Sequence, residues 1–182
     1  MTHLYIVELG GTRPDSLFEV HIVHALVAED EHAMIEACRE GFAHQLQAAH
    51  IDGWVAIALD REDDHSGPGP AGTAGRCWLL EAGRNSLAFL REQHDYRFVQ
   101  ALSGRDAMAI LRQEMPGWHV DSVIDVDRLA QERGWRLSRH DPESLPELHQ
   151  VARYIRFDRI SPARQGMMRD ADAALPAESR LI

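Results

Sequence analysis

Residues 4–28, LYIVELGGTRPDSLFEVHIVHALVA, and residues 77–101, CWLLEAGRNSLAFLREQHDYRFVQA, decide the fold, because they align without a gap at a constant offset of 73 residues. Six of the 25 aligned positions are identical: Glu8/Glu81, Gly10/Gly83, Leu17/Leu90, Glu19/Glu92, His21/His94 and Ala28/Ala101. Further along, the block His50-Ile51-Asp52-Gly53 aligns with His119-Val120-Asp121-Ser122. Matching blocks in the same order predict two copies of one unit within the chain.

The first copy predicts two strands, a helix and a third strand. Short apolar and β-branched runs indicate strands at 4–9, 19–28 and 53–59. Asp30 is suited to cap a helix from Glu31 to about Ala48. The helix is also indicated by apolar residues at helical spacing, which are Met34, Cys38 and Phe42.

The second copy predicts the same order of elements. Ser103 and Asp106 form a capping box before an apolar run, and Pro116-Gly117 ends the helix. Residues 120–126 then predict the third strand. We expect each pair of leading strands to form an antiparallel hairpin, whereas the helical connection predicts that the second and third strands run parallel.

These elements predict an α+β protein of two pseudo-symmetric ββαβ repeats, with helices packed on one face of one continuous sheet or of two abutting sheets. Residues 1–60 form the first repeat, 61–75 a flexible Gly/Pro linker, and 76–140 the second repeat with an edge strand at 134–138. Residues 141–182 are predicted to form a helix and a mobile tail. The helix is indicated by the capping box Ser144-x-x-Glu147 and by an apolar stripe, Leu145, Leu148, Ala152 and Ile155.

Composition excludes several classes of function. The net charge is −10 and no basic stripe is present, which argues against nucleic acid as a partner. The chain contains no lysine, which removes Schiff-base chemistry and the lysine of a phosphate-binding loop. No apolar run reaches the roughly 18 residues of a membrane span, and no signal peptide is recognisable, so a cytoplasmic location is expected.

No cofactor is expected. Residues 67–72, GPGPAG, match the Gly-x-Gly-x-x-Gly dinucleotide fingerprint, but no strand leads into them and no helix starts from them. Cys38 and Cys77 are too far apart in the sequence for a zinc ribbon or a redox motif, and we expect them to pack as small apolar side chains.

The pattern resembles the bacterial domain family of unknown function DUF1543. The resemblance rests on three motifs of the first copy, which are Leu9-Gly10-Gly11, Glu19-x-His21 and His50-Ile51-Asp52-x-Trp54. The second copy carries Glu92-x-His94-x-Tyr96 and His119-Val120-Asp121, but it has Gly83-Arg84 in place of Gly-Gly and Val123 in place of the tryptophan. The resemblance covers about residues 4–60 and 77–126. It implies a bacterial protein with a duplicated domain and implies no activity.

The polar residues that both copies keep are the candidate site. They are Glu19, His21, His50 and Asp52 in the first copy and Glu92, His94, His119 and Asp121 in the second. Glu8 and Glu81 are kept as well. Because residues two apart on a strand point to the same face, each copy can gather two imidazoles and two carboxylates. We predict that Glu19 or His21 lies within about 8 Å of His50 or Asp52, and that the same holds in the second copy.

Three interpretations of this set remain open. The residues can satisfy local backbone groups at strand ends, which is the interpretation that the sequence favours. They can bind a divalent metal such as zinc or manganese, or they can form an acid/base cluster. We therefore expect a non-catalytic binding module that presents a groove between its copies, with a metal-dependent or acid/base enzyme as the alternative; self-association into a homo-oligomer is left open.

Overall fold

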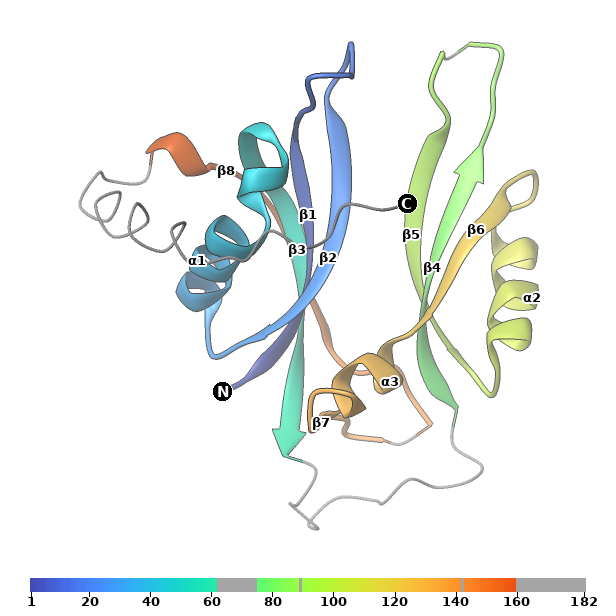
Figure 1. The fold of residues 1–182 in the computed structure, drawn as a ribbon. Helices are drawn as coiled ribbons and strands as arrows, with labels where there is room; N and C mark the ends of the chain where they lie inside the picture. Colours follow the sequence, from blue (N-terminus) through green and yellow to red (C-terminus); the bar gives the residue numbers. More distant parts are fainter. Residues whose placement is uncertain (62–74, 89, 142, 160–182) are drawn as a thin grey trace, which may run out of the picture.

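The computed structural model describes residues 1–61, 75–88, 90–141 and 143–159, and it has an α+β architecture with two antiparallel sheets (Figure 1). The first of its segments comprises β1 (His3–Thr12), β2 (Val20–Ala28), α1 (Glu31–Gly41), a 3-10 turn (Ala43–Gln45) and β3 (Gln47–Arg61). The second comprises β4 (Arg76–Arg84), β5 (Gln93–Ala101), α2 (Gly104–Glu114) and β6 (His119–Asp125). The remaining elements are α3 (Val126–Gln131), β7 (Trp135–Leu137), β8 (Leu148–Arg156) and a 3-10 turn (Phe157–Arg159).

Each sheet is built around its earliest strand. The first sheet has the order β2-β1-β3, with β8 and β7 both pairing with β3, and the second has the order β5-β4-β6. All of these pairings are antiparallel. The predicted hairpins are therefore confirmed. β2 and β3 run in the same direction, as predicted, but β1 lies between them.

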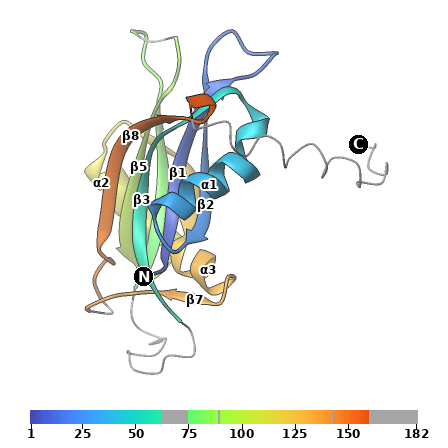
Figure 2. The ribbon, with the colours of Figure 1, turned by 90° about the vertical axis from the view of Figure 1, so that its left-hand side faces the viewer.

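The two sheets pack face to face, and α1 and α2 cover their outer faces (Figures 1 and 2). Met34 and Cys38 of α1 lie in one core with side chains of the outer face of the first sheet. Ala107 and Leu111 of α2 do the same on the second sheet. A third core lies between the sheets and contains Leu4, Ile6 and Ile57 of the first sheet with Cys77 and Leu79 of the second. Each helix thus packs on one face of its sheet, while the other face meets the partner sheet.

Both predicted helix starts are confirmed, but the end of the first helix is not. Asp30 accepts a hydrogen bond from the Ala33 amide at 2.8 Å, and Ser103 accepts one from the Asp106 amide at 3.2 Å. The helix ends at Gly41 instead of about Ala48. Residues 47–50 instead pair with the end of β1, because that strand offers backbone hydrogen bonds that the sequence pattern does not reveal.

The predicted helix in residues 144–155 is wrong, since residues 148–156 form β8. The apolar stripe that suggested a helix is also compatible with a strand that contains a bulge, and β8 has one opposite β3. Val151 and Ile155 pack against the core under α1, so docking onto β3 decided the conformation. The predicted edge strand at 134–138 does form as β7, but it pairs with β3 of the first sheet and not with the second sheet.

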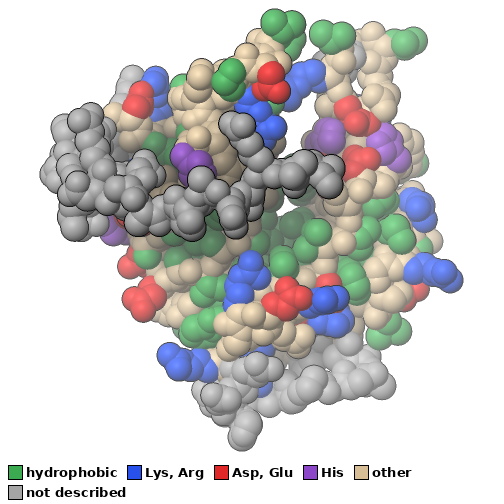
Figure 3. Space-filling view, viewed as in Figure 1, with side chains coloured by type: hydrophobic (Ala, Val, Ile, Leu, Met, Phe, Trp, Pro, Cys, Tyr) green, Lys and Arg blue, Asp and Glu red, His purple; other side chains and the backbone are tan. Residues whose placement is uncertain are grey.

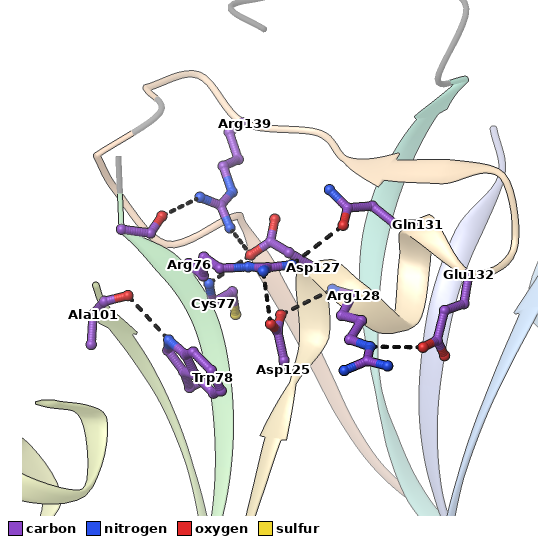
Figure 4. Close-up of polar contacts among 11 residues, drawn as sticks. Arg76, Cys77, Trp78, Ala101, Asp125, Asp127, Arg128, Gln131, Glu132 and Arg139 are labelled. Carbon is purple, nitrogen blue, oxygen red and sulfur yellow. Dashed lines mark hydrogen bonds and ion pairs between the residues drawn. The ribbon is translucent and has the colours of Figure 1, made fainter. Parts of the chain in front are cut away.

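A polar network ties the end of β7 to the start of β4 (Figure 4). Asp127 accepts hydrogen bonds from the Cys77 amide at 2.7 Å and from Arg139 at 2.6 Å. Arg139 also donates to the Gly75 carbonyl at 3.1 Å. Because Arg139 follows β7, which belongs to the first sheet, this largely buried ion pair helps hold the two sheets together.

Two predictions fall outside the residues that the structure describes. They are the flexible character of the linker, apart from its end residues 61 and 75, and the mobile tail from residue 160 onward. Within the described ranges, none of the helices combines the length and the apolar character that crossing a membrane requires.

Candidate functional site

Gly10 marks the centre of the first cluster of polar side chains. It pairs with His21 of β2 on one side and with His50 of β3 on the other. A Cβ atom at Gly10 would collide with His50 Nε2 and would lie 2.7 Å from Asp52 Oδ2 and 2.9 Å from Glu19 Oε1. Only glycine leaves room for side chains from both neighbouring strands to meet over the central strand.

The first cluster brings together all four residues predicted from the first copy. His50 Nε2 lies 2.8 Å from Glu19 Oε1 and 3.4 Å from Asp52 Oδ1. His21 Nε2 lies 3.4 Å from Asp52 Oδ2. The predicted proximity is therefore confirmed. The side chains meet over Gly10 of β1, because β1 lies between β2 and β3.

One histidine of the first cluster is covered. His50 is only 6% exposed, and the ring of Tyr154 from β8 lies against it with 4.5 Å between ring centroids. His50 Nδ1 donates to the Ala48 carbonyl at 3.0 Å, which directs Nε2 toward the carboxylates. Ala48 adopts φ of 51°, a strained value for a residue other than glycine, and this conformation places its carbonyl next to the ring.

Gly83 marks the centre of the second cluster in the same way. It pairs with His94 of β5 and with His119 of β6. A Cβ atom there would collide with Asp121 Oδ2 and would lie 2.6 Å from His119 Nε2. His119 Nε2 lies 2.7 Å from Glu92 Oε1 and 3.2 Å from Asp121 Oδ1. The second set of predicted residues is therefore also gathered in one place.

Glu81 orients one histidine of the second cluster. Its Oε1 accepts a hydrogen bond from His94 Nδ1 at 2.7 Å, and its Oε2 accepts one from Ser122 Oγ at 3.1 Å. The hydrogen bond to Glu81 is the main reason that the pKa of His94 is raised above its ordinary value of 6.5. Because Nδ1 carries this hydrogen, Nε2 of His94 is left facing Glu92, at 3.5 Å from its Oε2.

The second cluster has the donor atoms of a metal site. One ligand atom each from Glu92, His94 and Asp121 lies within 4.8 Å of the other two, which within the described ranges is the one such set of three. Imidazole and carboxylate donors suit zinc and manganese. Histidines that bind a metal through one ring nitrogen commonly donate a hydrogen bond from the other nitrogen to a carboxylate. His94 Nδ1 donates to Glu81 in this way.

Both clusters lie on the inner faces of the sheets. Gly10 and Ile6 are an even number of residues apart on β1, and Ile6 lies in the core between the sheets. Gly83 and Leu79 are related in the same way on β4. The two hairpin tips lie at the same end of the molecule (Figure 1), and Arg91 donates to the Glu19 carbonyl at 3.2 Å. The clusters therefore face the same space between the sheets.

The space-filling view agrees with this placement. Histidine and acidic side chains lie next to one another on the second sheet, beside the hollow between the two sheets (Figure 3). Tyr96 of β5 packs against the core between the sheets. Burial, followed by the negative charges of Glu81 and Glu8, raises the pKa of Tyr96 to about 12, so its hydroxyl stays protonated near neutral pH.

Sequence reasoning found the charged residues of both clusters but did not assign roles to their surroundings. Gly10 and Gly83 were recognised as identical positions, and this identity was the signal of the close approach above them. Tyr154 gave no signal, because residues 144–155 were predicted to be helical.

Comparison with known proteins shows the fold alone. No protein-family model matches the chain and no curated protein matches it, so the resemblance to DUF1543 stays a prediction. Among solved structures, the chain is similar to protein Il1583 from Idiomarina loihiensis, with a TM-score of 0.53 and 18% sequence identity. The similarity covers 86% of this chain and 98% of that protein.

Proposed function

We propose that the protein is a binding module for a divalent metal ion, and that the ion is held by the second cluster. The observation that carries the proposal is the convergence of Glu92, His94 and Asp121 within 4.8 Å over Gly83. Two carboxylates and one imidazole make a set of donors for zinc or manganese. Without a cation, these carboxylates lie close together with only imidazole and amide partners.

The surroundings of the second cluster support this assignment. The hydrogen bond from His94 Nδ1 to Glu81 makes Nε2 the nitrogen available to the ion and increases its basicity. His119 is half exposed and lies against Glu92 and Asp121, so it is placed to serve as a fourth ligand. The site opens toward the space between the sheets, which leaves coordination positions for a ligand from outside.

The first cluster is a poorer metal site, although it has the same residue types. The ring of Tyr154 covers the imidazole of His50, which is only 6% exposed, whereas the side chain of the matching His119 is half exposed. An ion would have to displace this packing in order to enter. We therefore expect one tightly bound ion per chain.

Metal content of the untagged protein tests the proposal. Protein stripped with a chelator is titrated with Zn²⁺ and Mn²⁺ by calorimetry, and the metal retained after gel filtration is measured by elemental analysis. We expect one ion per chain in the native protein, and its loss in His94→Ala. His149→Ala is the matched control, because His149 is an exposed histidine of β8 outside both clusters.

Two outcomes would overturn the assignment. One is the absence of a stoichiometric ion in the native protein. The other is unchanged binding in His94→Ala, or an equal loss in His149→Ala, since either result would place the ion elsewhere. The free energy of unfolding of each variant, measured in the metal-free state, separates a lost ligand from a lost fold.

We also propose that residues 4–60 and 77–126 are two copies of one ββαβ unit, as the sequence alignment predicts. The common order of elements supports this, as does the position of the central glycine opposite one histidine on each side. In both segments the central strand meets a register shift at the aligned positions, after Glu8 and after Glu81. An experimental structure in which the two segments fail to superpose would contradict the proposal.

A further inference from the structure

A pocket of about 210 Å³ lies between the two sheets, and Asp52 of the first cluster is among the residues that line it. Apolar side chains that line it come from both sheets, with Ile6 and Val23 on one side and Leu79 and Phe98 on the other. The polar side chains in its lining include Glu8, Asp52, Tyr96 and Gln150. None of the lining residues is an arginine, and the chain has no lysine.

Glu8 is a carboxylate without a partner in the described part of the chain. Its aligned counterpart Glu81 is bound by His94 and by Ser122, which stands directly opposite it on the neighbouring strand. At the aligned position of the first sheet, Glu8 pairs with Gly53. Glycine has no hydroxyl group that could donate a hydrogen bond to Glu8. The second carboxylate of the pocket, Asp52, has an Oδ2 atom that is buried and has no hydrogen-bond partner, with His21 Nε2 at 3.4 Å.

Two carboxylates with unused acceptor capacity in a mostly apolar pocket are costly unless a donor or a positive charge joins them. An ammonium group supplies both, with up to three N–H donors and a full charge. A short hydrocarbon chain attached to it would contact Ile6, Val23, Leu79 and Phe98. The aromatic rings of Tyr96 and Phe98 favour a cation further.

We propose that the pocket between the sheets binds a small organic amine in its protonated form, with the ammonium group between Glu8 and Asp52 and the carbon chain against the apolar walls. This site is separate from the proposed metal site, because it shares none of Glu92, His94 and Asp121. It goes beyond the metal-binding function and does not require it.

The probe that tests the proposal is n-butylamine, with 1-butanol and butyrate as the neutral and anionic counterparts of similar size. Binding to the full chain is followed at pH 7 by NMR chemical-shift changes and by calorimetry. We expect saturable binding of butylamine with shifts at Val23 and Phe98, and markedly weaker binding of the other two compounds. Glu8→Gln should weaken butylamine binding at least about tenfold, since it removes a charge-assisted hydrogen bond.

Glu81→Gln is the matched control, because it makes the same change at the aligned position and Glu81 does not line the pocket. We expect it to leave butylamine binding within about twofold of the native value. The His94→Ala variant should also bind butylamine normally, so that failure of the amine site and failure of the metal site can be told apart. Equal binding of butanol and butylamine, or undiminished binding in Glu8→Gln, would overturn the proposal.

Discussion

The two clusters contain the same residue types around a central glycine, but they differ at one histidine. We call the first cluster closed because its His50 is buried, and the second open because its His119 is half exposed. In the first, His50 is 6% exposed, whereas the side chain of its counterpart His119 in the second is 49% exposed. The difference comes from β8, which pairs with β3 and carries Tyr154 onto His50. In the part of the chain that the structure describes, β6 of the second sheet has no comparable outer strand.

This difference teaches that the same residue types can have different surroundings, and that the surroundings decide which of their atoms are accessible. The closed cluster holds His50 between Glu19 and the Ala48 carbonyl, so both ring nitrogens of His50 are engaged within the protein. The open cluster leaves His94 Nε2 and two carboxylates facing the space between the sheets. We expect the closed cluster to contribute more to stability and the open cluster to contribute more to binding.

Replacing the central glycines should give the largest effect and should separate the two clusters. Gly10→Ala forces a methyl group against His50, which cannot move away because Tyr154 covers it, and we expect a loss of about 2 kcal/mol or more in the free energy of unfolding. Gly83→Ala should cost less than about 1 kcal/mol, because the side chains of His119 and Asp121 are 49% and 29% exposed and can rotate into solvent, but it should abolish metal binding. Urea unfolding of both variants checks this. Equal losses would show that the cover over the first cluster has no energetic role.

The aligned glutamates should differ in their effect on the metal. Glu81→Gln weakens the hydrogen bond that orients His94, so we expect the affinity for Zn²⁺ to fall about tenfold. Glu8→Gln should leave this affinity unchanged, because Glu8 makes no hydrogen bond or ion pair with the described residues. Calorimetric titration of both variants provides the measurement. A similar drop in both would mean that overall negative charge governs metal affinity.

Removing the cover should make the first cluster resemble the second. Tyr154 is 61% exposed, so Tyr154→Ala should change the free energy of unfolding by less than about 1 kcal/mol. We expect a second, weaker Zn²⁺ ion to bind in this variant, which elemental analysis at saturating metal would detect. If the stoichiometry stays at one, the cover is not what keeps the ion out of the first cluster.

A smaller effect should distinguish the two segments in acid. His24 of the first segment stacks on Phe42 with ring centroids 3.8 Å apart, and its Nε2 is buried without a hydrogen-bond partner. Burial lowers the pKa of His24 below 6.5, so the unfolded chain binds the proton more readily and stability falls as the pH drops through about 6.5. The aligned residue of the second segment is Arg97, so the second segment has no histidine at this position. We expect His24→Phe to lose less stability than the native protein between pH 7.5 and pH 5.5, as measured by urea unfolding at both values.

The sequence by itself determined the local elements and the membership of both clusters. Asp30 and Ser103 begin helices because their side chains accept hydrogen bonds from amides that a helix leaves unpaired, which is a property of a few neighbouring residues. The alignment at an offset of 73 residues identified the glutamates, histidines and aspartates of both clusters, because the same residue types stand at matching positions.

Only the tertiary structure decided how these residues are used. Residues 148–156 became a strand, since the open edge of β3 supplied backbone hydrogen bonds that outweighed a helical pattern. The pairing of β8 with β3 also places Tyr154 over His50. Gly53, which pairs with Glu8, has no side chain that could donate to it, whereas Ser122 donates to Glu81 at the aligned position. Burial and partners across strands depend on contacts between distant residues, and these contacts made one cluster closed and the other open.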